Sequence, residues 1–100
     1  MPRPRRCRRI SFQPEVTYFK PAGVPLRHLD EEIIAMEELE AVRLIDVEEL
    51  SQEQVSKKMK ISQPTLSRLL KQGRSKIAKA LVKGKAIKVE GGNFEFHKIN

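Results

Sequence analysis

Between Leu50 and Lys71, hydrophobic residues recur with the spacing of two short helices that cross each other. Counted from Gln52 as the first position, apolar side chains stand at positions four, eight, ten, fifteen and eighteen, and the small Ser56 stands at five. The apolar residues are Val55, Met59, Ile61, Leu66 and Leu69. This spacing is typical of a helix-turn-helix, in which the apolar residues form a wedge and the small residue lets the helices cross closely. An ordinary helical hairpin in a small bundle is the alternative interpretation.

Both predicted helices carry start signals. Ser51 is followed three residues later by Gln54, as in a capping box. Ser62 is a second N-cap residue, and Pro64 falls in the first turn, where its missing N–H costs little. Lys60 stands at the turn position where a glycine is common, because that position often has a positive φ. A lysine there costs roughly 1 kcal/mol.

The segment from Asp30 to Glu49 also has a helical pattern. Apolar residues recur there at three-residue steps: Met36, Leu39, Val42 and Ile45. Asp30 could cap a long helix, or Ile33 and Ile34 could still be extended. Adjacent residues on a helix point about 100° apart. We therefore interpret the paired acids of this segment as a solvated face and not as an acid–base or metal site.

The second helix of the motif continues beyond Lys71. Its apolar face extends as far as Val82, Gly73 marks a close approach to another helix, and Gly84 is a C-cap glycine. Residues 87–96 then predict a hairpin with a Gly91–Gly92 turn, in which Val89 faces Phe94 and Ile87 faces Phe96. An isolated hairpin is marginal in water. It therefore needs a partner, either short strands predicted at 10–12 and 16–19 or a second copy of the chain.

The predicted fold is mainly α, with a helix-turn-helix in a three-helix core and a small β element made of N-terminal strands and the C-terminal hairpin. We divide the chain into a basic N-terminal arm with short strands (1–29), a helix-turn-helix domain (30–84) and the hairpin (85–100). At 100 residues the chain is one domain at most.

Charge is separated along the chain. Residues 1–29 carry a net charge of +6, residues 30–54 of −9, residues 55–88 of +11 and residues 89–100 of −1. A surface that serves only solubility would mix the two signs. The separation indicates a protein that presents one face to a polyanion, and it favours the DNA-binding interpretation of the motif. The basic arm of residues 1–9 cannot bury a core and should be mobile when free. It either contacts phosphates or is a solvated tail.

Several classes of protein are excluded. The single cysteine, Cys7, rules out an internal disulfide framework. No apolar run is long enough to span a bilayer, and the basic start leads into no signal peptide. There is no nucleophile–base set, phosphate-binding loop or metal-ligand spacing, so we expect neither an enzyme nor a cofactor. The expected location is the cytoplasm, in association with the nucleoid.

The chain resembles an uncharacterised prokaryotic family with a predicted DNA-binding role, known as domain of unknown function 134. The matching runs are PRPRRCRRI, FKPAGVPL, EELEAVRL, LSQEQVSKKMKIS, TLSRLL and ALVKGKAIKVEGG. The motif is also similar to the helix-turn-helix of sigma-factor region 4, which implies a transcriptional role. The chain departs from the family pattern at Ser56, where alanine is common, at Lys60, and at Gln63–Pro64, where an arginine usually leads.

We therefore predict sequence-specific binding of double-stranded DNA, as expected of a transcriptional regulator, with the second helix in the major groove. The base-reading candidates are Gln63, Ser67, Arg68 and Lys71. Arg68 suits guanine and Gln63 suits adenine. The phosphate-binding candidates are Lys57, Lys58, Thr65, Arg74, Arg3, Arg5, Arg6, Arg8 and Arg9. A two-fold dimer is expected because one motif covers few base pairs, with the hairpin or the tail of the long helix as its interface.

Two other interpretations remain. The chain could be a protein-interaction module that docks on the transcription machinery through its acidic 30–54 segment. It could also be a basic RNA-binding protein, although five aromatic residues provide few stacking platforms.

Overall fold

A computed structural model describes residues 8–92 and 94–96 of the protein. In chain order the elements are β1 (Arg8–Ile10), β2 (Tyr18–Phe19), the 3-10 turn η1 (Leu26–His28), β3 (Glu31–Ile34), α1 (Met36–Val42), the π-helical turn η2 (Arg43–Val47), α2 (Gln52–Met59), α3 (Gln63–Lys83), β4 (Ala86–Val89) and β5 (Phe94–Phe96). The predicted fold class, mainly α with a small β element, is confirmed. No helix within these residues is long and apolar enough to cross a membrane.

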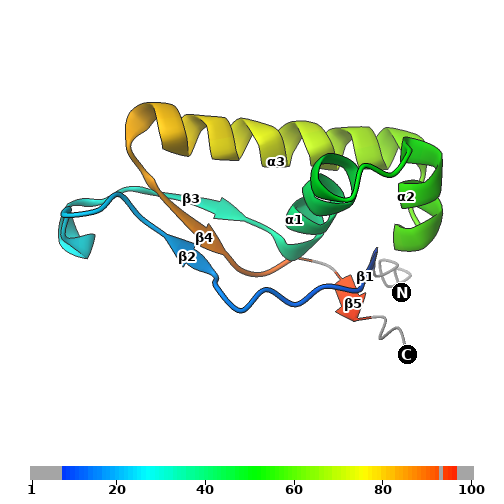
Figure 1. Cartoon of the computed structure of the whole chain (residues 1–100), viewed down its shortest axis with the longest axis horizontal. Helices are drawn as coiled ribbons and strands as arrows, with labels where there is room; N and C mark the ends of the chain where they lie inside the picture. The colour runs from blue at the N-terminus through cyan, green and yellow to red at the C-terminus, as the bar shows by residue number, and fades with distance from the viewer. Residues whose placement is uncertain (1–7, 93, 97–100) are drawn as a thin grey trace, which may run out of the picture.

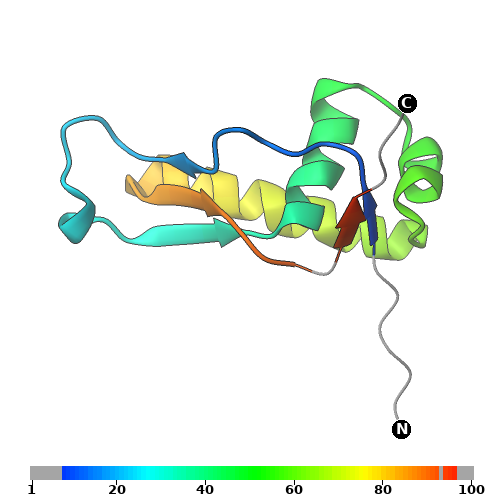
Figure 2. The ribbon, with the colours of Figure 1, turned by 90° about the horizontal axis from the view of Figure 1, so that it is seen from below.

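The long helix α3 extends along most of the molecule, and the turn η1 lies beyond its C-terminal end (Figure 1). Helices α1 and α2 lie beside its N-terminal half, and the sheet of β2, β3 and β4 lies beside its C-terminal half (Figure 1). Strands β1 and β5 form a separate ladder near α1 and α2 (Figure 2). The predicted helix-turn-helix motif therefore consists of α2 and the N-terminal half of α3.

The larger sheet has the order β2-β4-β3. Strand β4 runs antiparallel to β2, with Tyr18 opposite Lys88, and parallel to β3, with Ile34 opposite Val89. Strands β1 and β5 pair in parallel. The 30–49 segment thus begins as a strand and becomes helical only at Met36, so the extended alternative for Ile33 and Ile34 is the one that the fold adopts.

The predicted hairpin is wrong. Strand β4 already has a neighbour on each edge, so no edge is free for residues 94–96, and the chain continues past Gly92 to pair with β1. The carbonyl of Gly91 accepts a hydrogen bond from the backbone N–H of Met36 at 3.0 Å, so the diglycine segment meets the start of α1. Of the two partners expected for these residues, the N-terminal strands are the ones present: β4 pairs with β2, and β5 pairs with β1, which lies at Arg8–Ile10 and not at the predicted 10–12.

The predicted wedge is the centre of the main core. Val55, Met59 and Leu66 have no exposed surface, and they pack with Ala41, Leu44, Leu69 and Leu70. At Gly73, α3 approaches α1 closely, as the sequence predicts. A Cβ at this position would lie 3.0 Å from Val42 Cγ2 and 3.3 Å from the Glu38 carbonyl oxygen. The apolar face of α3 ends earlier than predicted, since Leu81 is 75% exposed and Val82 is 84% exposed.

Candidate nucleic-acid interface

The two helices of the motif begin as the sequence predicts. Ser51 Oγ accepts the backbone N–H of Gln54 at 3.1 Å, and Gln54 Oε1 accepts the backbone N–H of Ser51 at 3.0 Å. Ser62 caps α3 by accepting the backbone N–H of Thr65. Lys60 adopts the left-handed conformation, with φ 57° and ψ 49°. The helix-turn-helix geometry is therefore kept although lysine replaces the usual glycine.

The outer side of α3 carries all four predicted base-reading residues. Gln63, Ser67, Arg68 and Lys71 are each exposed, whereas Leu66, Leu69 and Leu70 on the other side are buried. The helix thus presents polar side chains to solvent while its apolar side is held by the core. Amide, hydroxyl and guanidinium groups on an exposed helix are the groups that read base edges in the major groove.

A chain of hydrogen bonds connects the cap of α3 to Arg68. Ser62 Oγ donates to Thr65 Oγ1 at 2.9 Å, and Arg68 Nη2 donates to the same Thr65 Oγ1 at 3.2 Å. Among the described residues Arg68 makes no ion pair, so its charge is not neutralised by the fold. The guanidinium therefore has a hydrogen bond that directs it toward Thr65 and no carboxylate partner among the described residues.

The predicted phosphate contacts differ in their surroundings. Lys58 is exposed and has no ion-pair partner in the described part of the chain, whereas Lys57 Nζ lies 3.4 Å from Glu53 Oε1. Arg74 donates to both carboxylate oxygens of Asp46, at 3.0 and 2.6 Å. These hydrogen bonds lower the pKa of Asp46 and raise the pKa of Arg74. Arg74 is thus engaged by the protein itself.

The prediction of a mobile basic arm is wrong for its last two arginines. Arg8 and Arg9 belong to β1, and Arg8 Nη1 lies 3.1 Å from Glu37 Oε2 with the two side chains only 12% and 8% exposed. Arg9 is half-buried. The other predicted contacts of the arm, Arg3, Arg5 and Arg6, lie outside the described residues.

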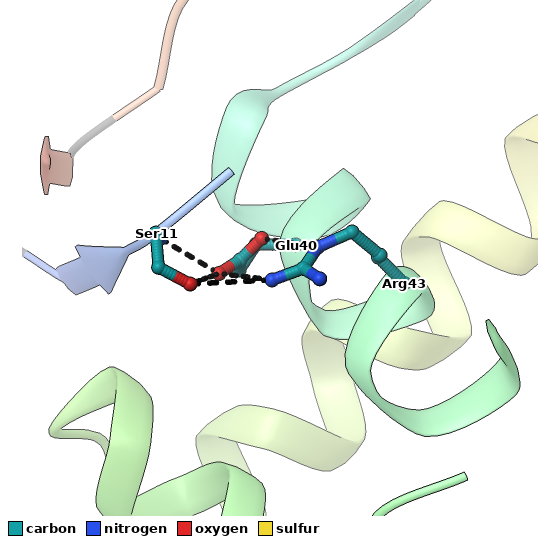
Figure 3. Close-up of polar contacts among 3 residues, drawn as sticks. All are labelled: Ser11, Glu40 and Arg43. Carbon is teal, nitrogen blue, oxygen red and sulfur yellow. Dashed lines mark hydrogen bonds and ion pairs between the residues drawn. The ribbon is translucent and has the colours of Figure 1, made fainter. Parts of the chain in front are cut away.

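The solvated acidic face is wrong for α1, whose three glutamates are buried, whereas Glu31, Glu48 and Glu49 are exposed. Glu37, Glu38 and Glu40 are 6%, 4% and 3% exposed. Glu40 receives hydrogen bonds from the Ser11 backbone at 2.9 Å and from Arg43 Nε at 3.0 Å, which ties α1 to the segment after β1 (Figure 3). A carboxylate is buried only where such partners exist. Because Arg8 and Lys76 are distant in the sequence from the glutamates that they pair with, the periodicity of α1 does not indicate this burial.

Three ion pairs join residues 32–46 of the acidic block to residues 74–85 of the basic block. Besides Asp46–Arg74, they are Glu38–Lys76 at 2.8 Å and Glu32–Lys85 at 2.9 Å. Several basic side chains of α2, of α3 and of the turn between them have no ion pair among the described residues. They are Lys58, Lys60, Arg68, Lys71, Lys79 and Lys83. Arg68 and Lys79 are eleven positions apart and so lie on nearly the same side of α3. The charge without an ion pair therefore includes the side of α3 that is predicted to read bases.

A polar hollow of about 410 Å³ adjoins the same helix. Thr65, Arg68 and Gln72 of α3 line one side, and Arg8, Glu37 and Gly92 line the others. Position 92 in the β4–β5 connection requires glycine, because φ there is 108° and an added Cβ would collide with Glu37. The hollow is not predictable from the sequence pattern, because it depends on the β4–β5 connection, which that pattern predicts as a hairpin turn.

Comparisons with known proteins agree on one family. Residues 1–97 match the family model described as "Protein of unknown function DUF134". A "UPF0251 protein" of Moorella thermoacetica is 58% identical over 94 residues, and one of Desulforudis audaxviator is 57% identical over 96 residues. The chain spans 63% of the length of each of these two relatives. The UPF0251 protein Teth514_1147 of Thermoanaerobacter sp. (strain X514) is 53% identical over 98 residues, which cover 98% of this chain and 87% of the relative. No solved structure matches the chain.

Proposed function

The chain belongs to the DUF134 family, whose description assigns no activity, and we propose that it binds double-stranded DNA sequence-specifically through α3 and regulates transcription. The observation that carries this proposal is the exposed row of Gln63, Ser67, Arg68 and Lys71 on a helix whose opposite side is held in a closed apolar wedge. Such a helix can enter the major groove without disturbing the core.

The roles follow from chemistry and position. Arg68 donates two hydrogen bonds to O6 and N7 of a guanine, and Gln63, in the first turn of α3, binds an adenine. Lys58 and the hydroxyl of Thr65 hold phosphates and set the register on the duplex. Arg74 joins them only when Asp46 releases it.

The transcriptional part of the proposal rests on the similarity of the motif to sigma-factor region 4. A two-fold dimer remains part of the proposal, with the tail of α3 as its interface, because Leu81 and Val82 are exposed there. Docking of the acidic segment on the transcription machinery is less favoured, because Glu37, Glu38 and Glu40 are buried and engaged within the fold.

The proposal is tested by duplex binding of two variants and a control. Arg68→Ala should cost about 1–3 kcal/mol against the preferred site and relax the preference at one base pair. Lys58→Ala should weaken binding to all duplexes alike and reduce the salt slope by about one. Arg27→Ala is the matched control, since Arg27 is exposed on the distant turn η1 and has no ion pair among the described residues. If Arg68→Ala and Arg27→Ala behave alike on every duplex, direct reading by Arg68 is wrong.

A further inference from the structure

Thr65 is fixed to the start of α3 in two ways. Its backbone N–H donates to Ser62 Oγ at 3.2 Å, and its side-chain Oγ1 accepts the hydroxyl of Ser62 at 2.9 Å. The N-cap serine is itself held in an extended conformation, with φ −73° and ψ 159°. The Thr65 hydroxyl therefore has a defined position relative to the helix.

Arg68 depends on that hydroxyl for its orientation. Among the described residues, the Arg68 side chain makes one hydrogen bond, from Nη2 to Thr65 Oγ1, and no carboxylate pairs with it. The neighbouring hollow is lined by Glu37 and Glu38 as well as by Arg68. Without the Thr65 hydroxyl, the guanidinium would spread over many rotamers or turn toward these acids. Either change adds an ordering cost to DNA binding.

We propose that Thr65 is a positioning residue that holds Arg68 ready for a bidentate contact with one guanine; this inference rests on the proposed function. A guanidinium has five N–H donors, and the bond to Thr65 uses one, so four remain, of which guanine O6 and N7 need two. Thr65 Oγ1 accepts from both Ser62 and Arg68, which leaves its own proton for a phosphate oxygen. Thr65 thus couples the phosphate contact to base reading.

The test compares Thr65→Val and Thr65→Ser on a duplex selected by the wild-type protein and on a random duplex. Valine keeps the side-chain shape and the backbone cap but removes the hydroxyl. We expect Thr65→Val to weaken binding to both duplexes through loss of the phosphate contact and to lower affinity for the selected duplex about five- to tenfold further, and we expect Thr65→Ser to restore both. Thr17→Val is the control, since Thr17 is exposed and its side chain makes no hydrogen bond among the described residues.

A double-variant cycle separates positioning from a merely structural role. In the Arg68→Ala protein, Thr65→Val should cause no further loss of preference, because the residue it positions is gone. The rotation of the Arg68 guanidinium, measured by NMR on the free protein, should be faster in Thr65→Val than in wild type. The inference is overturned if Thr65→Val keeps the wild-type preference, if its effect adds fully to that of Arg68→Ala, or if the rotation does not change. A wild-type protein with no duplex preference would instead overturn the proposed function.

Discussion

Lys76 Nζ lies 2.8 Å from Glu38 Oε1, and this ion pair joins α3 to α1 across thirty-eight positions of the sequence. The same carboxylate oxygen accepts the backbone N–H of Ala35 at 3.0 Å, just before α1 begins. The Glu38 side chain is 6% exposed, so its charge depends on these partners. One buried glutamate therefore sets the start of α1 and the position of α3 against it.

Removal of Lys76 should destabilise the fold. Lys76→Ala leaves a buried carboxylate without its ion-pair partner, and we expect a loss of about 1–3 kcal/mol in the free energy of unfolding, measured in urea. Lys79→Ala is the matched control on the same helix, because Lys79 is exposed and has no ion pair within the described residues. Its effect should stay within about 0.5 kcal/mol. Equal losses for the two variants would contradict the role of the pair.

The turn residue Lys60 should be a site of stabilisation. Its φ of 57° favours glycine, so Lys60→Gly should raise the free energy of unfolding by roughly 0.5–1 kcal/mol. Lys58→Gly, two positions earlier inside α2, should have the opposite sign, with a loss of about 1 kcal/mol. Urea unfolding of both variants tests this difference, and two losses would show that the turn is not strained.

The close approach at Gly73 should make alanine unfavourable there. Alanine in a helix gains about 1 kcal/mol over glycine, but its Cβ would meet Val42 and the Glu38 backbone. We expect Gly73→Ala to be destabilising in the wild-type protein and less so in a Val42→Ala background, where one neighbour is removed. Thermal unfolding of the four proteins of this cycle measures the coupling, and purely additive effects would argue against the contact.

Stability should fall in acid through Asp46 and Glu32. Hydrogen bonds from Arg74 and Lys85 lower the pKa of these carboxyls below their ordinary values of 3.8 and 4.5. A lowered pKa in the folded state gives stability that is present above the unfolded pKa and is lost as the pH falls through the folded one. Urea unfolding between about pH 6 and pH 3 should therefore show a decline that is shallower in Asp46→Asn. An unchanged slope would mean that the Asp46 pair adds nothing.

The same substitution should strengthen DNA binding. Asp46→Asn removes the partner that engages Arg74 and so frees a cation on α3. We expect higher affinity for all duplexes and a salt slope steeper by about one. Glu48→Gln is the control for loss of negative charge alone, since Glu48 is exposed and has no ion pair among the described residues. If both variants bind equally well, Arg74 is not released toward phosphate.

The local features of the motif were predictable because their determinants lie within a few residues. The Ser51–Gln54 capping box, the left-handed Lys60 and the buried wedge of Val55, Met59 and Leu66 all follow from spacing alone. The exposure of Arg68 follows from the same helical period.

The long-range pairings were not predictable from periodicity. The two edges of β4 are occupied by β2 and β3, which turns the expected hairpin into two separate pairings. Burial of Glu37 depends on Arg8, which comes from a strand that the sequence presents as part of a basic tail. Both features require knowledge of which distant segments meet.

The most direct test of the central claim is selection of bound duplexes from a random pool by the full chain, repeated at two salt concentrations. If α3 reads bases directly, a short shared site that contains a guanine is enriched, and the preference for that guanine is lost when Arg68→Ala replaces the wild-type protein. Recovery of unrelated sequences at both salt concentrations, or an enriched site that Arg68→Ala still selects unchanged, would contradict it.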